Sequence, residues 1–465
     1  MAEGHGPSML WTGRQIAQAV GGSLEGDFSV SGIGIDSRAL QPGDLFVALA
    51  AERDGHDFLA AARAAGAAGA LVSRQVRGPH VRVADTLAAL QDLARAARER
   101  APAVRRGAVT GSVGKTSVTQ AVLAGLKAAG RAHGSTQSFN NHIGVPLTLA
   151  RMPPATERAV FEMGMNHPGE IAPLTRLVGP HAVAVTNVEA VHVENFADGE
   201  GGVARAKAEI FEGLQSDGVA VLNADSRWFG FLADEAAAAG ARVVGFGRTQ
   251  GAAARLVDFA AAPEGAIVTA QIFGRELRYP LAQTAAHWGP MSLCALMLLE
   301  ALEVDRDVAL AALGALEPLA GRGAVRSATL AGGGAFTLVD ESYNASPVSV
   351  AAALENLGRQ AASGRRIAVL TDMLELGPDS PDRHAGLAEE VDHAGVDVVF
   401  CAGDLMRHLF DAVPARRRGA WAPSAEALIP TVREAISPGD VVMVKGSKAS
   451  HAWKIAAALQ HGGDA

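Results

Sequence analysis

The chain has 465 residues, of which 49% are hydrophobic and 19% are charged, and its formal net charge is −8. This length suits about three domains, and the composition excludes a disordered chain. The acidic balance argues against a nucleic-acid partner, which a basic surface would attract. Two distant cysteines, Cys294 and Cys401, give neither a disulfide framework nor zinc-ligand spacing. No signal peptide or membrane span is predicted, so we expect a cytoplasmic protein.

The first 84 residues predict a small α/β unit. Three segments predict in turn a strand, a helix and a strand: "DLFVAL" (44–49), "DFLAAARAAG" (57–66) and "AGALVS" (68–73). A helix follows over 85–100, where apolar residues recur at helical spacing and Asp85 is placed to cap it. We therefore predict an N-terminal domain at residues 1–84.

Strands then alternate with helices as far as about residue 316. Four short apolar runs are suited to a buried parallel sheet: "GAVT" (107–110), "AVFEM" (159–163), "AVAVTN" (182–187) and "VAVLN" (219–223). We expect repeated strand–helix units here and a central α/β domain over residues 85–316.

A third alternation follows. Its strands are predicted at "FTLVDES" (336–342), "RRIAVLTDM" (365–373), "VDVVFCAG" (396–403) and "GDVVMVKGS" (439–447), and a helix at "SVAAALENLG" (349–358). We predict a Rossmann-like C-terminal domain over residues 317–465. The whole chain is thus predicted to be an α/β protein of three domains.

The segment "VTGSVGKTS" (109–117) carries the strongest functional signal. A strand ends there, glycines let the backbone wrap a phosphate, and a helix starts with its N–H groups directed at the anion. We predict a nucleotide site in which Lys115 reaches the β- and γ-phosphates and the Thr116 hydroxyl binds Mg²⁺. The predicted nucleotide-binding residues of the loop are Thr110, Gly111, Ser112, Val113, Gly114, Lys115, Thr116 and Ser117. The alternative is a chance glycine turn before a helix.

An acid and an imidazole follow at the ends of the next two strands. Glu162 lies in "FEMGMN" and His192 in "TNVEAVHVE". Ligand groups of an open parallel sheet collect at the carboxyl ends of its strands. Glu162 could therefore hold a magnesium ion that bridges the phosphates, and His192 a second one. The alternatives are a helix-capping acid and a histidine in a surface loop.

Lysine is rare in this chain. Only six of the 41 basic residues are lysines, and one of them, Lys207, lies in "GVARAKAEIFEGL". A lysine can lose its proton and react where an arginine cannot. We therefore predict a reactive amine near the metal site. The alternative is an ordinary lysine on the surface of a helix.

Two further segments leave their roles open. Asn140 and Asn141 begin "NNHIGVPLTL", and they either contact a substrate or only form a turn. "KGSKAS" (445–450) is either a second anion-binding loop or the solvated end of a strand.

The start of the C-terminal domain offers another group of candidates. In "DESYNASP" (340–347), an acid at a strand end precedes Tyr343 and Asn344. A turn explains the proline and the asparagine of this segment, but it does not need the aromatic ring. "LAGRG" (319–323) is predicted to be an interdomain loop in which Arg322 is free to meet a phosphate.

Together these segments resemble the Mur ligase family, ATP-dependent peptide ligases of bacterial cell-wall precursor assembly. The resemblance spans nearly the whole chain and rests on "DSRALQPGDLFVAL" (36–49), "DGHDF" (54–58), "TGSVGKTS", "NNHIGVPLTL", "EMGMN", "TNVEAVHVENF", "ARAKAEI", "DESYNASP", "DMLELG" (372–377) and "VKGSK". "EMGMN", "SYNASP" and "DMLELG" favour a member that adds D-alanyl-D-alanine. Three positions depart from the family: Met291 in "HWGPM" (287–291) stands where Asn is usual, Ser346 replaces the second Asn of "NANP", and Thr371 replaces the Gly before "DMLELG".

The resemblance implies a reaction and its participants. These are ATP, two magnesium ions, UDP-N-acetylmuramoyl-tripeptide and D-alanyl-D-alanine, which react through an acyl phosphate in a monomeric enzyme. It also implies that CO₂ carbamylates Lys207, turning the amine into a metal-binding carboxylate. The implied catalytic residues are Lys115, Lys207 and His192; the metal ligands Thr116, Glu162, His192 and Lys207; the further ATP-binding residues His287, Arg322, Asp340, Tyr343 and Asn344; and the substrate-binding residues Ser37, Arg38, Asn140 and Asn141.

Three rival interpretations remain at this point. A different ligase of the same family, such as the enzyme that adds the third residue or folylpolyglutamate synthase, would share every nucleotide and metal residue. A P-loop regulatory or transport ATPase would hydrolyse ATP without a carboxylate acceptor, but it does not explain Lys207 or the third domain. A member that has lost activity and only binds its ligands conflicts with the intact Lys115, Glu162 and Lys207.

Overall fold

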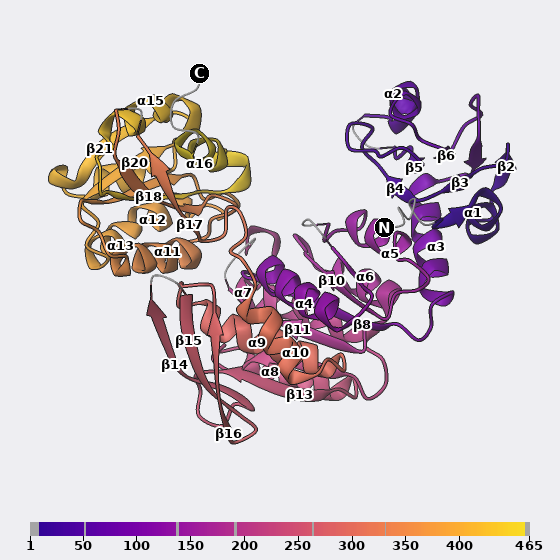
Figure 1. The fold of residues 1–465 in the computed structure, drawn as a ribbon, viewed down its shortest axis with the longest axis horizontal. Helices are drawn as coiled ribbons and strands as arrows, with labels where there is room; N and C mark the ends of the chain where they lie inside the picture. Colours follow the sequence, from indigo (N-terminus) through magenta and orange to yellow (C-terminus); the bar gives the residue numbers. More distant parts are fainter. Residues whose placement is uncertain are drawn as a thin grey trace, which may run out of the picture.

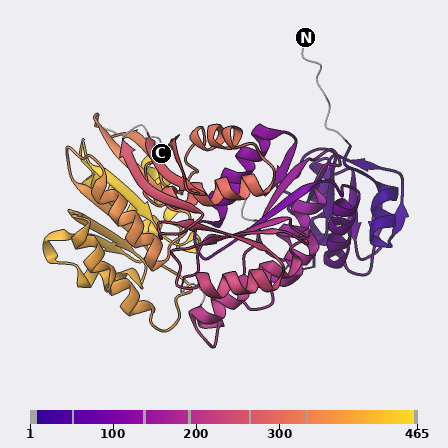
Figure 2. The same ribbon diagram turned by 90° about the horizontal axis from the view of Figure 1, so that it is seen from below.

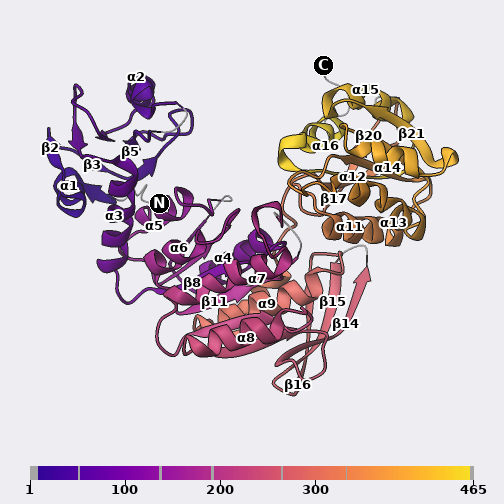
Figure 3. The ribbon, with the colours of Figure 1, turned by 180° about the vertical axis from the view of Figure 1, so that it is seen from behind.

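The chain folds into three lobes, each built on its own sheet (Figure 1). The computed structural model describes residues 9–50, 53–135, 139–189, 193–262, 265–330 and 332–460. In the view of Figure 1 the N-terminal and C-terminal lobes both lie above the central one, and Figure 3 shows the same arrangement from behind. The predicted α/β fold is confirmed, whereas the predicted domain boundaries stay predictions. No helix of the described residues is long and apolar enough to cross a membrane.

The N-terminal lobe holds a five-stranded sheet of order β2-β7-β6-β5-β4. Its strands are β2 Ser23–Glu25, β4 Gly32–Gly34, β5 Asp44–Val47, β6 Gly69–Val72 and β7 His80–Arg82, beside the small pair β1 Trp11–Thr12 and β3 Ser29–Val30. Its helices are α1 Gly13–Val20, the 3₁₀ turn η1 Gly55–Phe58 and α2 Leu59–Ala64. The helix expected over 57–66 is therefore a 3₁₀ turn that continues as α2.

The central lobe holds a nine-stranded sheet of order β16-β15-β14-β13-β12-β11-β8-β10-β9. Its strands are β8 Arg105–Thr110, β9 Ala132–Gly134, β10 Arg158–Glu162, β11 Ala182–Val185, β12 Val219–Asn223, β13 Arg242–Gly247, β14 Ala254–Ala262, β15 Gly265–Ile272 and β16 Arg275–Leu281. Neighbouring strands from β9 to β14 run parallel.

The expectation of strand–helix repeats as far as residue 316 was wrong for the last three strands. β14, β15 and β16 follow one another without a helix and pair antiparallel. Only Phe273 and Gly274 separate β15 from β16, and both have positive φ angles (49° and 79°). Positive φ at both central residues matches the twist of a tight hairpin, so the chain can return directly without a crossover helix.

Helices cover both faces of the central sheet (Figure 2). They are α3 Thr86–Glu99, α4 Lys115–Ala129, α5 Gly144–Ala150, α6 Ile171–Val178, α7 Glu200–Ala208, α8 Phe229–Ala238, α9 Trp288–Ala301 and α10 Arg306–Gly314, with the 3₁₀ turns η2 Val193–Asn195 and η3 Glu209–Gly213. Asp85 caps α3 as predicted. In β8, Ala108 packs in the core shared with α3, α5 and α6, whereas Val109 packs in the core shared with α4 and α9. Burial on both faces explains why these strands are continuously apolar.

The C-terminal lobe holds a six-stranded sheet of order β17-β18-β22-β19-β20-β21. Its strands are β17 Ala324–Thr329, β18 Ala335–Glu341, β19 Arg366–Thr371, β20 Val398–Ala402, β21 Arg418–Ala422 and β22 Val441–Lys445. Its helices are α11 Pro347–Arg359, α12 Ser380–Ala385, α13 Leu387–His393, α14 Met406–Ala412, α15 Ala425–Ala435 and α16 Ala452–Gln460, with the 3₁₀ turns η4 Ala415–Arg417 and η5 Lys448–Ser450. β22 lies between β18 and β19 and parallel to both. The segments "DESYNASP", "DMLELG" and "KGSKAS" therefore leave the sheet at one edge.

Candidate active site

The predicted phosphate-binding loop lies between β8 and α4. β8 ends at Thr110, and α4 begins at Lys115, so Thr116 and Ser117 lie in its first turn. Gly111 and Gly114 have φ angles of 148° and 85°. A Cβ on Gly111 would collide with the Thr186 hydroxyl, and a Cβ on Gly114 would lie 2.5 Å from the Cε of Met291. Both positions therefore need glycine, for space as well as for conformation.

The loop after β11 holds the phosphate-binding loop in place. The backbone N–H of Val113 donates to Asn187 Oδ1 (2.9 Å), and that of Ser112 donates to the Asn187 carbonyl (3.1 Å). The Thr186 hydroxyl donates to the Val113 carbonyl (2.6 Å). Sequence reasoning missed Thr186 and Asn187. Their place directly after a strand that neighbours β8 was the signal that could have found them.

Lys115 lies among other charged groups. Its Nζ donates to the carbonyl oxygens of Gly111 (2.7 Å) and Ser112 (3.3 Å). Burial lowers the pKa of Lys115; the negative charge of Glu162 opposes this shift, and the positive charge of Arg322 adds to it. Lys115 is therefore affected by charges from two elements, Glu162 at the end of β10 and Arg322 of the C-terminal segment.

Glu162 is a buried carboxylate with one oxygen unused. Its side chain closes β10 and is 1% exposed. Oε1 accepts a hydrogen bond from Asn140 Nδ2 (2.8 Å), whereas Oε2 has no hydrogen-bond partner among the described residues. A buried carboxylate oxygen without a partner is costly, and it is the kind of ligand that Mg²⁺ prefers. The site therefore fits a cation at this position.

The two asparagines predicted to bind substrate have local partners. Asn140 orients Glu162, as described above, and its carbonyl accepts the N–H of Gly164 (2.8 Å). Asn141 Oδ1 accepts the N–H groups of Ile143 (3.1 Å) and Gly144 (2.9 Å) at the start of α5. The substrate contact of both residues stays a prediction.

Lys207 is buried in α7 and is only 3% exposed. Burial lowers its pKa well below the usual value, and the positive charge of Lys115 lowers it further. The alternative of a lysine on a helix surface is therefore wrong. The predicted partner His192 lies outside the described residues. The described residues hold no group of three or more His, Cys, Asp or Glu side chains that could bind a metal, so the full ligand set stays a prediction.

Arg322 and the "DESYNASP" segment form one turn of the C-terminal lobe. The guanidinium of Arg322 stacks 3.8 Å from the centre of the Tyr343 ring. The carboxylate of Asp340 accepts hydrogen bonds from the Gly321 N–H (2.9 Å) and from the N–H (3.1 Å) and hydroxyl (2.6 Å) of Ser342. Asp340 thus fixes the turn that presents Arg322, while its predicted contact with ATP stays a prediction.

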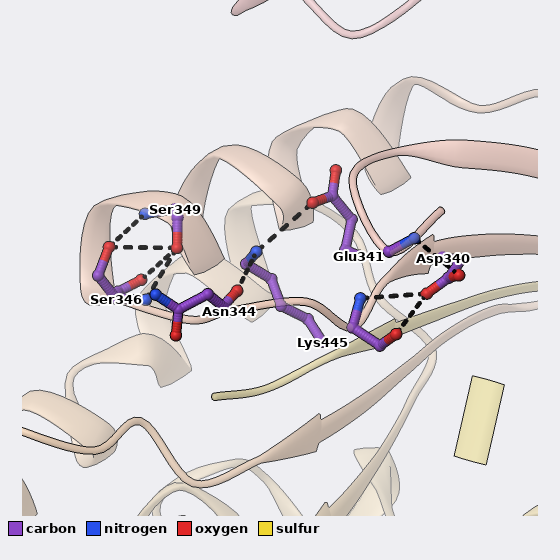
Figure 4. Close-up of polar contacts among 8 residues, drawn as sticks. Asp340, Glu341, Asn344, Ser346, Ser349 and Lys445 are labelled. Atoms are coloured by element: carbon purple, nitrogen blue, oxygen red, sulfur yellow. Dashed lines mark hydrogen bonds and ion pairs between the residues drawn. The ribbon is translucent and has the colours of Figure 1, made fainter. Parts of the chain in front are cut away.

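A buried ion pair lies beside this turn (Figure 4). Lys445 Nζ lies 3.5 Å from Glu341 Oε2 and donates to the Asn344 carbonyl (3.0 Å). Burial lowers the pKa of His287 at the start of α9; the Glu341 charge opposes this shift and the Lys445 charge adds to it. The charges of the C-terminal pair thus act on His287, a residue of the central lobe. The segment "KGSKAS" begins in the core, where Lys445 is buried, and reaches the surface at Lys448, which is exposed.

Ser37 and Arg38 lie apart from these groups, in the loop after β4. Arg38 is exposed, and its guanidinium makes two hydrogen bonds to the Asp36 carboxylate (2.9 and 2.7 Å). No described contact joins them to the phosphate-binding loop, so their role stays a prediction.

Comparisons with known proteins match this architecture over its length. Three family models match in chain order: "Mur ligase family, catalytic domain" (residues 29–106), "Mur ligase middle domain" (109–297) and "Mur ligase, glutamate ligase domain" (325–448). The UDP-N-acetylmuramoyl-tripeptide–D-alanyl-D-alanine ligase of Escherichia coli is 35% identical over 97% of this chain and 98% of its own. The ligase of the same name from Bacillus subtilis is 32% identical over 94% and 95%.

The chain belongs to the Mur ligase family. The predicted family and the predicted class of enzyme, an ATP-dependent ligase, are confirmed. A crystal structure of MurF from Acinetobacter baumannii superimposes with a TM-score of 0.85 at 25% identity, covering 98% of this chain and all of that one. The chain therefore shares its three-lobed fold with the Acinetobacter baumannii enzyme over nearly its whole length.

Two of the three departures from the usual Mur ligase pattern, at Met291 and Ser346, have local explanations. Met291, in the first turn of α9, packs its thioether against Gly114 of the phosphate-binding loop. Ser346 is the N-cap of α11: its hydroxyl accepts the Ser349 N–H (3.4 Å), and the Ser349 hydroxyl accepts the Ser346 N–H (2.8 Å) (Figure 4). Serine and asparagine are both good N-caps, so the exchange at 346 keeps the helix start intact.

Proposed function

We propose that this Mur ligase joins D-alanyl-D-alanine to UDP-N-acetylmuramoyl-tripeptide, converting ATP to ADP and phosphate. The observation that carries the proposal is the full-length match to ligases of that name, 35% identical over 97% of the chain for one of them. The gathering of Lys115, Glu162 and Lys207 around one loop supports the same reaction. A different amino-acid or peptide ligase of the family is the second candidate, because it would use the same nucleotide groups.

The proposed reaction has two steps. A carboxylate oxygen of the tripeptide attacks the γ-phosphorus of ATP, the bond to the β–γ bridging oxygen breaks, and an acyl phosphate and ADP form. The amine nitrogen of D-alanyl-D-alanine then attacks the acyl carbon; a C–N bond forms, phosphate leaves, and the amine loses a proton. Lys115 and Arg322 lie where they can stabilise the negative charge on the transferred group. Closure of the lobes would exclude water from the acyl phosphate.

Two magnesium ions form part of the proposal. Bound Mg²⁺ neutralises phosphate charge and draws electrons from the phosphorus. Thr116, Glu162, His192 and a carbamylated Lys207 would hold the ions, and the unpartnered Oε2 of Glu162 fits this role. Asn140 would then orient the carboxylate through its bond to Oε1.

Carbamylation of Lys207 fits its surroundings. The amine must be neutral to attack CO₂, and burial lowers its pKa in that direction. The neutral amine adds CO₂ and loses one proton, so a carbamate anion forms where the protonated amine would be a buried cation. Repulsion from Lys115 then becomes attraction, which stabilises the carbamate.

The remaining residues are proposed to bind the ends of the substrates. Ser37 and Arg38 would contact the UDP-sugar, and Asn140 and Asn141 would line the path of the peptide. His287, Asp340, Tyr343 and Asn344 would lie along the nucleoside of ATP. We also propose that the enzyme is a cytoplasmic monomer.

An omission experiment tests the proposed function. Purified protein is given ATP, Mg²⁺, UDP-N-acetylmuramoyl-tripeptide and D-alanyl-D-alanine, each left out in turn, while phosphate release and product mass are followed. We expect phosphate release only with all four, and a product heavier than the tripeptide by one dipeptide less one water. Release without a peptide substrate, or a product carrying a single amino acid in place of the dipeptide, would refute the assignment.

A further inference from the structure

Helix α7, which carries Lys207, is held at both ends by glutamates. Glu200 is its first residue, and Glu209 follows its last. Glu200 and Lys207 are seven residues apart, which places them on one face of the helix. The contacts of these two glutamates therefore set the position of the amine along the helix axis.

Glu200 is bonded to the start of α8. Its Oε1 accepts hydrogen bonds from Trp228 Nε1 (2.7 Å) and Arg227 Nε (2.9 Å). Its Oε2 lies 2.5 Å from the Arg227 guanidinium, and the Glu200 side chain is only 18% exposed. A partly buried carboxylate with bonds to two side chains has a fixed position.

The first turn of α7 also packs closely against two rings. A Cβ on Gly201 would lie 3.3 Å from the Trp228 ring, and one on Gly202 would lie 2.8 Å from Phe196. Any larger residue at 202 would push the helix away from η2. The two glycines thus let α7 fit between Trp228 and Phe196, so that rotation of the helix is restricted.

Glu189, in the loop after β11, is affected by the charge of Glu200 and is bonded to the phosphate-binding loop. Burial raises the pKa of Glu189; the nearby charge of Glu200 raises it further, and Arg227 opposes the shift. The backbone of Glu189 is bonded to the Ser112 hydroxyl through its carbonyl (3.1 Å) and its N–H (2.9 Å). The loop after β11 is therefore bonded to the phosphate-binding loop at Ser112, and the charge of Glu200 acts on the same loop.

The other end of α7 is joined to the segment that follows Glu162. The Glu209 carboxylate accepts the N–H groups of Gly169 (2.6 Å), Ile171 (3.0 Å) and Ala172 (3.1 Å) at the start of α6. A carboxylate at a helix N-terminus is stabilised by the unpaired N–H groups there. Glu209 thus ties the end of the helix that carries Lys207 to the segment between β10 and α6.

We propose that Glu200, with its partner Trp228, and Glu209 are positioning residues that aim the Lys207 nitrogen at the phosphate-binding loop. This inference rests on the proposed role of Lys207 as a carbamylated metal ligand. None of the three residues need touch ATP, Mg²⁺ or the peptides. They would affect the reaction only by setting the position of the Lys207 nitrogen.

Four variants test the proposal: Glu200→Ala, Glu209→Gln, Trp228→Phe and the reference Lys207→Ala. Matched controls are Glu212→Gln, an exposed glutamate of η3, and Trp453→Phe, a half-exposed tryptophan of α16. The measurements are kcat, the Mg²⁺ concentration for half-maximal rate, and the ¹³C NMR signal of the carbamate after incubation with ¹³C-bicarbonate. Thermal melting identifies any variant that fails to fold, and Trp228→Phe removes the indole N–H while keeping an aromatic ring at position 228.

We expect Glu200→Ala and Glu209→Gln to lower kcat about tenfold, and Trp228→Phe about threefold, since a 1 Å misplacement can cost ~10²-fold. The carbamate signal should fall, and the Mg²⁺ concentration for half-maximal rate should rise, more in Glu200→Ala and Glu209→Gln than in Trp228→Phe. Both control variants should match wild type. The proposal is overturned if the positioning variants keep the wild-type signal and kcat while Lys207→Ala loses both. If Lys207→Ala keeps its activity, the role of Lys207 and the positioning proposal both fall, although the ligase reaction stands.

Discussion

Gly111 brings the phosphate-binding loop against the strand next to it. Its φ of 148° lies in a region that favours glycine, and the Thr186 hydroxyl fills the space where a Cβ would be. That hydroxyl is already bonded to the Val113 carbonyl. The absence of a side chain at Gly111 thus allows the phosphate-binding loop and the loop after β11 to meet.

Gly111→Ala should therefore abolish nucleotide binding. The added Cβ must displace Thr186, and this breaks the bond that holds Val113. We expect the melting temperature to lose its response to added ATP and Mg²⁺. Gly230→Ala is the control: Gly230 lies in α8 with nothing within 4 Å of the new Cβ, so the variant should keep binding and gain up to ~1 kcal/mol. An ATP response in Gly111→Ala equal to that of wild type would contradict this reading of the loop.

Lys207 gives a pH-dependent prediction at the same scale. Its pKa in the folded protein lies well below the usual 10.5 because the site is buried, so the unfolded chain binds the proton more tightly. The penalty on folding is fully present below the folded pKa, and it declines as pH rises from there toward the unfolded pKa. In CO₂-free buffer, Lys207→Met should melt higher than wild type near pH 7, and this gain should shrink toward pH 10. Lys448→Met, at an exposed lysine, should show no such trend; an identical trend there would disprove the assignment to burial.

At the scale of elements, strand ends and helix starts carry the site. β8, β10 and β11 end beside one another, so Lys115, Glu162 and the Thr186–Asn187 pair lie at one edge of the sheet. In the C-terminal lobe, β18 and β22 bring Glu341 opposite Lys445 in the strand register. Short elements with fixed ends thus bring together groups that are distant in sequence, such as these two, which are 104 residues apart.

The N-cap of α11 is open to test at this scale. Ser346→Ala removes the side-chain acceptor of a helix N–H, so it should lower the free energy of unfolding of the C-terminal lobe by about 1 kcal/mol. Ser346→Asn keeps an acceptor and should remain within a few tenths of wild type. Urea unfolding followed by circular dichroism measures both. Equal losses in the two variants would show that volume at position 346, which is 7% exposed, matters more than the cap.

At the scale of the whole molecule, residues from two lobes share one site. Arg322 precedes the C-terminal sheet, yet its charge acts on Lys115 of the central lobe and on Lys445 of its own. The charges of Glu341 and Lys445 in turn act on the pKa of His287 in the central lobe, in opposite directions. A triphosphate bound on Lys115 would therefore meet cations from both lobes.

Arg322→Met should weaken nucleotide binding without unfolding either lobe. Loss of one cation near a phosphate should raise the ATP requirement and lower kcat by about 10²-fold, while the melting temperature without nucleotide stays near wild type. The stabilisation by ADP and Mg²⁺ should shrink at the same time. Arg326→Met, an exposed arginine of β17, is the matched control, and a loss of similar size there would mean that general surface charge explains the effect.

The sequence by itself determined the local features: the strand–glycine–helix loop, the buried strands of the α/β sheets and the family motifs. These depend on neighbouring residues and on backbone propensity, so they can be read along the chain. The tertiary structure decided the rest. The antiparallel β14–β16 meander, the hold of Thr186 and Asn187 on the loop, the burial of Lys207 and the two glutamates that fix α7 all arise between distant segments. Hydrogen bonds and desolvation across such distances depend on packing, which no stretch of sequence displays alone.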